Sequence, residues 1–103
     1  MDLNEIHFHD CRLIRVIEVG ATHDLHFEVI YPIDWENNLF EPRTIVFLDV
    51  LEYRIDEGPF SGEPTLLDAY DNGSKGEYRS VTLQTNAGTR SLLFKQVELR
   101  SPD

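Results

Sequence analysis

The sequence contains one cysteine, Cys11, and no long apolar run. A single cysteine excludes an intrachain disulfide, and unpaired thiols are typical of proteins kept in a reducing compartment. No apolar segment approaches the roughly 20 residues that a helix needs to cross a bilayer. The first residues, Met1 to Glu5, are acidic and lack the basic start and apolar core of a signal peptide. The sequence therefore predicts a cytoplasmic protein that does not associate with a membrane.

Basic residues are also scarce, with nine Lys and Arg against nineteen Asp and Glu and a formal net charge of −10. Binding to a nucleic-acid backbone requires clustered Lys and Arg, so a nucleic-acid partner is not expected. An anionic membrane surface would repel such a chain. An acidic surface favours a basic protein partner, because complementary charge speeds encounter. The alternative interpretation is that the charge only keeps a small domain soluble.

The length of 103 residues and a hydrophobic content of 41% predict a single domain over residues 1–103, with one core. The densest run of branched and aromatic residues is 43–55 (RTIVFLDVLEYRI). We expect it to form a central strand, with Asp49 indicating a bulge or a break. The predicted core comprises Val46, Phe47 and Leu48 from this run, together with Phe27 and Val29.

Alternating polar and apolar residues predict strands over 12–19, 24–31, 78–85, 89–95 and 96–100 in addition to the central run. Residues 4–11 suit a strand or a packed arm. Pro32 is expected to end the second strand, because it lacks a backbone N–H. Residues 33–42 then read as a long loop whose Trp35, Leu39 and Phe40 pack on the sheet. Residues 63–70 are the only helix candidate. Residues 71–76 are expected to form an exposed turn. Residues 101–103 are expected to form a frayed end. The sequence predicts an all-β antiparallel sandwich or partly open barrel of about six strands, with at most one short helix.

The residues that could carry chemistry are few. His7 and His9 would lie on the same face of a strand and could offer two imidazoles to one metal. No further ligand motif accompanies them, so no metal or cofactor is predicted, although the sequence does not decide the point. Cys11 shares a face with His9, but an unpaired cysteine is more often a small buried apolar residue than a nucleophile. No phosphate-binding loop or nucleophile elbow is present, and we predict that the protein is not an enzyme.

The string His9-Asp10-Cys11-Arg12-Leu13 resembles the opening of small β-rich bacterial domains of unknown function, some of which are immunity proteins of polymorphic toxin systems. The later string 83–88 (LQTNAG), followed by a strand that ends near Val97, is similar as well. The resemblance implies a non-catalytic fold in which Asp10 is structural. Cys11 stands where Ser or Ala is often found in these domains, which argues against a nucleophile at this position.

Two main hypotheses for function follow. The first is a non-enzymatic acidic interaction domain, with an immunity-type protein among the candidates, that binds a basic protein partner through Glu36, Glu41, Asp56 and Glu57. The alternative is a small-ligand-binding β-barrel or sandwich whose pocket is lined by Trp35, Phe40 and Tyr53. A metal-dependent enzyme that uses His7 and His9 is a third possibility. The sequence does not fix the oligomeric state.

Overall fold

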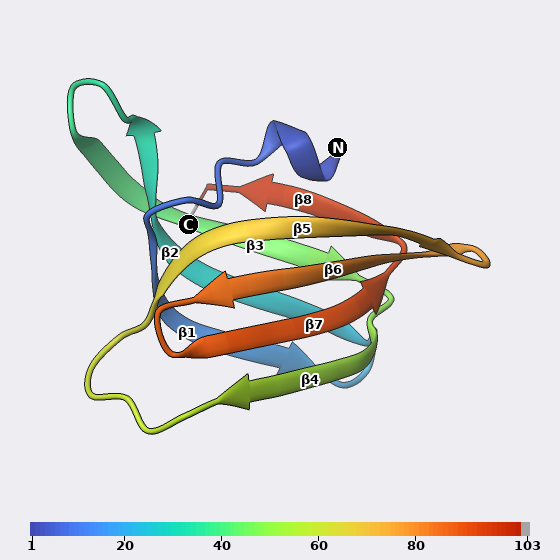
Figure 1. The fold of residues 1–103 in the computed structure, drawn as a ribbon. Coiled ribbons are helices and arrows are strands. Elements are labelled where there is room, and N and C mark those ends of the chain that lie inside the picture. Colours follow the sequence, from blue (N-terminus) through green and yellow to red (C-terminus); the bar gives the residue numbers. More distant parts are fainter. Residues whose placement is uncertain (102–103) are drawn as a thin grey trace.

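A computed structural model describes residues 1–101 as one open antiparallel sheet of eight strands with a single 3-10 turn at Leu3–Glu5. The sheet order is β4-β7-β6-β5-β1-β2-β3-β8 (Figure 1). The all-β antiparallel prediction is confirmed, but the expected number of about six strands is too small. No helix in this part of the chain is long and apolar enough to cross a membrane. The strands are β1 (Cys11–Val19), β2 (Asp24–Asp34), β3 (Leu39–Leu48), β4 (Leu51–Glu57), β5 (Thr65–Lys75), β6 (Tyr78–Thr85), β7 (Gly88–Phe94) and β8 (Gln96–Arg100).

The two additional strands arise from the central run and from the predicted helix. Asp49 has a left-handed φ of 55° and separates β3 from β4, as its position inside the apolar run indicated. The helix predicted over 63–70 is wrong, because this segment begins β5 and pairs with β6. The turn predicted over 71–76 is wrong for the same reason, since β5 continues to Lys75. Pairing with a neighbouring strand overrides the weak helical pattern of a short segment.

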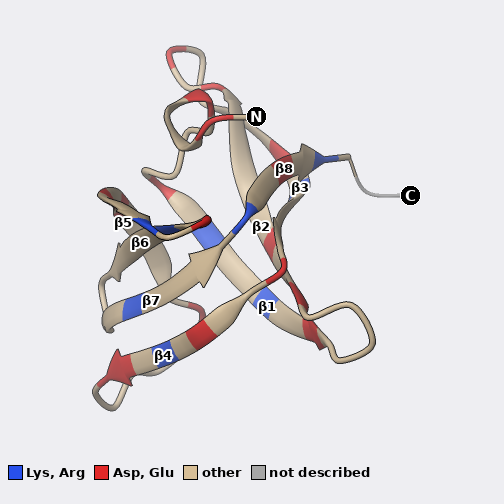
Figure 2. Cartoon of the chain, turned by 90° about the vertical axis from the view of Figure 1, so that its right-hand side faces the viewer, with Lys and Arg blue, Asp and Glu red and all other residues tan. Residues whose placement is uncertain are grey.

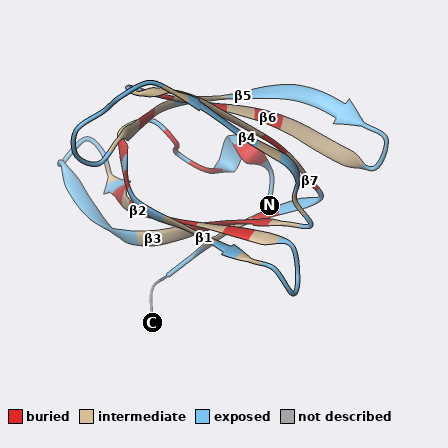
Figure 3. Cartoon of the chain, turned by 90° about the horizontal axis from the view of Figure 1, so that it is seen from below, coloured by how far each residue is buried: buried red, intermediate tan, exposed pale blue. Residues whose placement is uncertain are grey.

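The sheet bends round a single core, so that β4 to β7 face β1 to β3 (Figure 3). In the sheet, β1 and β5 are joined by only two residue pairs, Cys11↔Leu66 and Arg12↔Thr65. The Phe47 ring of β3 makes an edge-to-face contact with Phe27 of the neighbouring β2, with centroids 5.5 Å apart, and a second one across the core with Phe94 of β7, at 5.1 Å. Of the predicted core, Phe27, Val29, Val46 and Phe47 are fully buried and Leu48 is half-buried.

The N-terminal segment is a packed arm rather than a strand, which settles the alternative left open by its sequence. Leu3, Ile6 and Phe8 are buried and belong to the main core cluster. The arm is tied to β2, because the His7 backbone N–H donates to the Tyr31 hydroxyl oxygen at 2.8 Å. At the other end of the chain, most of the predicted frayed segment, residues 102 and 103, lies outside the described residues.

The loop predicted over 33–42 is wrong. β2 continues through Pro32 to Asp34, and β3 begins at Leu39, so a hairpin occupies this segment. β1 pairs with β2 only as far as Ile30, so the outer part of β2 has β3 as its one neighbour. A strand with one neighbour leaves half of its N–H groups outside any ladder, and a proline is accommodated there.

Candidate functional site

The outer part of the β2–β3 hairpin, residues 31–42, projects beyond the rest of the sheet (Figure 1). We call it the hairpin ribbon. Its two strands pair with each other from Tyr31↔Glu41 to Asp34↔Leu39. β1 stops pairing with β2 at Ile30, and β8 pairs with β3 only from Thr44 onward. In the described part of the chain, the hairpin ribbon is therefore a two-stranded extension with no third strand beside it.

The turn of the hairpin ribbon is held by local hydrogen bonds. The Asp34 carboxylate accepts from the backbone N–H of Asn37 at 3.3 Å and from the Asn37 side-chain amide at 2.7 Å. The Asn38 N–H donates to the Trp35 carbonyl at 3.1 Å, and Asn38 has a left-handed φ of 57°. Asn and Asp tolerate this conformation and favour such turns. The ribbon thus has a defined shape at its tip.

Apolar side chains are unusually exposed on the hairpin ribbon. Trp35 is 54% exposed and Leu39 52%, and Ile33 and Phe40 are exposed as well. The prediction that Trp35, Leu39 and Phe40 pack on the sheet is wrong, because the ribbon extends past the strands that they would cover. Several exposed apolar side chains on one projecting segment are a feature that interaction surfaces share.

Trp35 is exposed but oriented. Its indole N–H donates to an Asp10 carboxylate oxygen at 3.0 Å, across 25 residues of sequence. Asp10 has a left-handed φ of 69°, and its own backbone N–H donates to the Leu66 carbonyl at 2.9 Å. Asp10 therefore lies at the junction of the N-terminal arm, β5 and the hairpin ribbon. Its side chain holds the tryptophan ring of the ribbon.

The four predicted partner-binding acids do not share one surface. Glu36 and Glu41 are exposed on the hairpin ribbon, and Glu41 lies 3.2 Å from the Arg43 guanidinium. Asp56 is exposed on β4, which ends the sheet order on the opposite side from β3 and β8. Glu57 is turned toward β7, where its carboxylate accepts two hydrogen bonds from Arg90 at 2.7 and 2.9 Å.

The ion pair between Glu57 and Arg90 is mostly shielded from solvent, with side chains only 13% and 12% exposed. Hydrogen bonding to Arg90 lowers the pKa of Glu57 below its ordinary value, and a weaker bond from Thr85 acts in the same direction. Arg90 also donates to the Tyr53 hydroxyl oxygen at 3.2 Å. Glu57 is therefore committed to an internal network that joins β4, β6 and β7.

The aromatic residues proposed for a ligand pocket are also separated. Tyr53 on β4 packs edge-to-face on Phe27, with ring centroids 6.0 Å apart. Trp35 and Phe40 are exposed on the hairpin ribbon. The structure does not bring these three side chains to one cavity.

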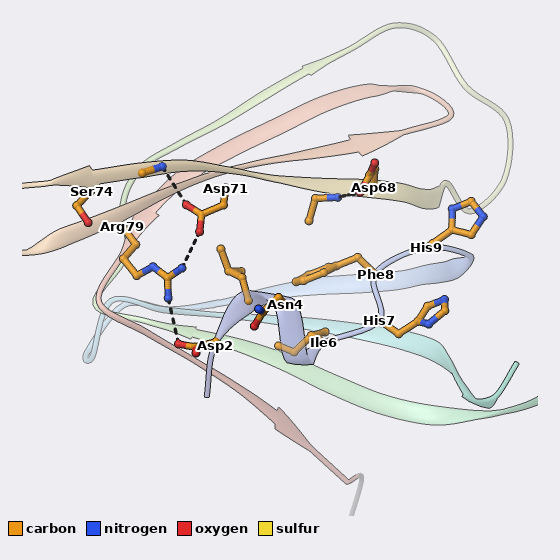
Figure 4. Close-up of a pocket in the computed structure, with 13 residues that line it drawn as sticks. Asp2, Asn4, Ile6, His7, Phe8, His9, Asp68, Asp71, Ser74 and Arg79 are labelled. Carbon is orange, nitrogen blue, oxygen red and sulfur yellow. Dashed lines mark hydrogen bonds and ion pairs between the residues drawn. The ribbon is translucent and has the colours of Figure 1, made fainter.

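An open hollow of about 710 Å³ separates the N-terminal arm from the β5–β6 hairpin (Figure 4). Arg79 lies in this hollow between two acids, 2.8 Å from the Asp71 carboxylate and 3.6 Å from that of Asp2. A hydrogen bond from the Gly73 N–H, and a second from Arg79, lower the pKa of Asp71. Both acids offset the charge of Arg79, so among residues 1–101 the hollow offers no unpaired Lys or Arg to an anionic ligand.

His7 and His9 lie at one end of the same hollow, with ring centroids 6.4 Å apart (Figure 4). The His9 Nδ1 is 2.6 Å from the Leu67 carbonyl oxygen, so this nitrogen carries the proton and donates. Its Nε2 lies 3.5 Å from the Asp10 carboxylate. Within residues 1–101, no group of three or more His, Cys, Asp or Glu side chains is arranged to hold a metal ion.

Cys11 is fully buried, and its thiol donates to the His7 carbonyl oxygen at 3.1 Å. Burial, with a smaller contribution from Asp10, raises the pKa of Cys11 to about 12. A thiolate is the nucleophilic form of cysteine, and this environment suppresses it. Cys11 is thus a packed core residue.

Comparison with models of protein families, with curated proteins and with solved structures finds no match for this chain. The resemblance of residues 9–13 to bacterial immunity-type domains therefore stays a prediction. Sequence reasoning identified the acids of the hairpin ribbon but missed its projecting shape. The signal was present in the polar stretch from Asp34 to Asn38, which has the composition of a tight turn between two strands.

Proposed function

We propose that this protein is a non-enzymatic interaction domain that binds a basic protein partner through the hairpin ribbon. The observation that supports the proposal is the projecting pair of strands, which carries the exposed side chains of Trp35, Leu39 and Phe40 together with those of Glu36 and Glu41. Protein interfaces commonly have an apolar, aromatic centre surrounded by polar residues. Tryptophan is among the residues most enriched at positions that dominate binding energy.

The orientation of Trp35 adds to the argument. A side chain that is held before binding loses less conformational entropy when a partner covers it. The hydrogen bond from Trp35 to Asp10 provides such preorganisation. The proposal thereby gives Asp10 a role that agrees with the structural one implied by the resemblance.

The pairing of the basic residues supports a partner with a basic surface. Of the nine Lys and Arg side chains, all except Arg54 and Lys75 lie in ion pairs with acids in the described part of the chain. The remaining acids leave an excess of negative charge, and Glu36 takes part in none of the ion pairs within residues 1–101. A basic surface would be steered toward such a molecule. A toxin with a basic face, inhibited by an immunity-type protein, fits this description.

Trp35 provides a direct assay, because it is the single tryptophan of the chain. A partner is first captured from the native host and purified, and the fluorescence of Trp35 is then titrated with it. Binding at the hairpin ribbon moves the indole out of water and shifts its emission to shorter wavelength. We expect the association rate to fall as salt rises from low to physiological concentration, where the Debye length is about 8 Å.

Two leucines of similar exposure give a matched pair of variants. Leu39 lies on the hairpin ribbon and Leu51 on β4, at 52% and 45% exposed. We expect Leu39→Ala to weaken binding of the partner by about tenfold and Leu51→Ala to leave that binding unchanged. Equal effects of the two substitutions, or binding without a change in Trp35 emission, would place the interface elsewhere.

Replacing Glu36 and Glu41 by glutamine should slow association of the partner more than it speeds dissociation.

A further inference from the structure

β4 is an edge strand with an unpaired side. It forms ladder pairs with β7 and ends the sheet order. Figures 1 and 2 show it at the margin of the molecule, with no other strand of residues 1–101 beyond it on the side away from β7. An exposed edge presents backbone N–H and C=O groups that can pair with another chain.

The side chains at the centre of β4 lack partners. Ile55 is 56% exposed, the largest exposed fraction among the apolar residues within strands. Arg54 and Asp56, on either side of it, are exposed and form no ion pair within residues 1–101. Figure 2 shows the resulting pattern, a basic position between acidic ones along a single strand.

The contact with Gly88 of β7 shows which backbone groups of β4 point outward. A Cβ placed on Gly88 would lie 2.2 Å from the carbonyl oxygen of Asp56, so that carbonyl faces β7. The N–H and C=O of one strand residue point to the same side, and successive residues alternate. The N–H and C=O of Ile55 and Glu57 therefore face the open edge.

We propose that β4 pairs with β4 of a second copy of this chain, antiparallel, about a two-fold axis at Ile55. Ile55 then lies opposite Ile55 of the second copy. Arg54 lies opposite Asp56 of the second copy, and the symmetry repeats this charge pair. The outward-facing backbone groups of Ile55 meet each other, as hydrogen-bonded residue pairs of antiparallel strands do.

Other registers of the same symmetric pairing are less favourable. Outward-facing residues must lie opposite one another, so the axis can shift only in whole residues along β4. An axis at Arg54 places Arg54 opposite Arg54 of the second copy. An axis at Asp56 likewise places the two Asp56 side chains opposite each other. Like charges directly opposite one another destabilise a strand pair. An axis at Tyr53 requires a regular strand at Glu52, which has a left-handed φ of 53° at the bulge of β4.

The dimer is expected to be weak, because a few residues of one strand form a small interface compared with stable complexes. The assay is sedimentation equilibrium of the full chain from about 1 μM to about 1 mM, a range that brackets weak self-association. The average mass should rise from 12.0 kDa toward twice that value. Ile55→Lys should hold the protein at the monomer mass, whereas Ile33→Lys, at an exposed isoleucine of the hairpin ribbon, should not.

A charge exchange tests the register itself. Arg54→Asp and Asp56→Arg each place like charges opposite one another twice and should raise the dissociation constant by about tenfold or more. The double variant R54D/D56R restores opposite charges and should restore the dimer at an unchanged net charge. Urea unfolding of each variant checks that the fold is intact.

Several outcomes would overturn the proposal. The first is a monomer mass at every protein concentration tested. In that case Arg54, Asp56 and the bulge would serve to protect the edge against pairing, which is a common use of charges and bulges on edge strands. A double variant that remains monomeric would refute the register. A mass that exceeds the dimer would indicate head-to-tail pairing of β4 with β8, which does not close.

Discussion

The ion pair between Glu57 and Arg90 gives the sharpest test of how the sheet is held together. We consider Glu57→Gln, which keeps the shape of the side chain and removes its charge. In the native protein the carboxylate accepts two hydrogen bonds from Arg90 and one, at 3.3 Å, from the Thr85 hydroxyl. After the substitution, the Arg90 guanidinium remains mostly buried without its anion. Its hydrogen bond to Tyr53 does not replace the lost charge.

The expected loss follows from the burial of the pair. Hydrogen bonds to charged groups contribute about 1.5–3 kcal/mol each at most, and breaking a fully buried pair costs about 3–5 kcal/mol. Both side chains are still about one-eighth exposed, so solvent relieves part of this penalty. We expect Glu57→Gln to lower the free energy of unfolding by about 2–3 kcal/mol at pH 7. A urea titration measures this change, with an unchanged denaturant slope if the unfolded state is unaffected.

The same pair predicts a pH dependence. Arg90 lowers the pKa of Glu57 in the folded state below its unfolded value of about 4.3. A group with a lowered folded pKa stabilises the fold above the unfolded pKa, and this contribution is lost as the pH falls through the folded pKa. The difference in stability between wild type and Glu57→Gln should therefore be constant from about pH 6 to pH 8 and shrink below about pH 4.

Glu63→Gln serves as the control, because Glu63 forms an exposed pair with Arg12 at 3.3 Å. Exposed pairs contribute about 0–1 kcal/mol, so this substitution should change stability little. A loss below about 0.5 kcal/mol for Glu57→Gln, or a loss equal to that of the control, would show that the network does not hold β4 to β7.

The remaining predictions concern the core and the junction beneath the hairpin ribbon. Phe47→Ala should lower the free energy of unfolding by about 3–5 kcal/mol, because Phe47 is fully buried between Phe27 and Phe94; a urea titration that gives less than about 1 kcal/mol would contradict this. Asp10→Ala should lower stability by about 1–2 kcal/mol and release the Trp35 indole, which a drop in Trp35 fluorescence anisotropy would report; unchanged anisotropy would show that the hydrogen bond does not hold the ring.

The sequence predicted the parts of the fold whose pattern is set by burial on one face of a strand. Phe27 and Val29 alternate with the polar residues His26 and Glu28 and are buried as expected. The helix predicted near Leu66 failed because the pattern of so short a segment is ambiguous. Its pairing with Cys11 and Thr85, which lie far away in sequence, fixes it as a strand. Long-range partners of this kind leave no local signal.

The candidate site was harder to predict for a related reason. The apolar residues from Ile33 to Phe40 suggested packing, because sequence alone does not show where neighbouring strands end. They are exposed because β1 stops pairing at Ile30 and β8 starts pairing only at Thr44. Glu57 illustrates the opposite case. The composition suggested an acid on the surface, but the Glu57 carboxylate is bound inside the protein by Arg90, which lies 33 residues away in the sequence. Acidic composition therefore predicted the sign of the surface charge, but strand lengths and ion-pair geometry decide which acids a partner can reach.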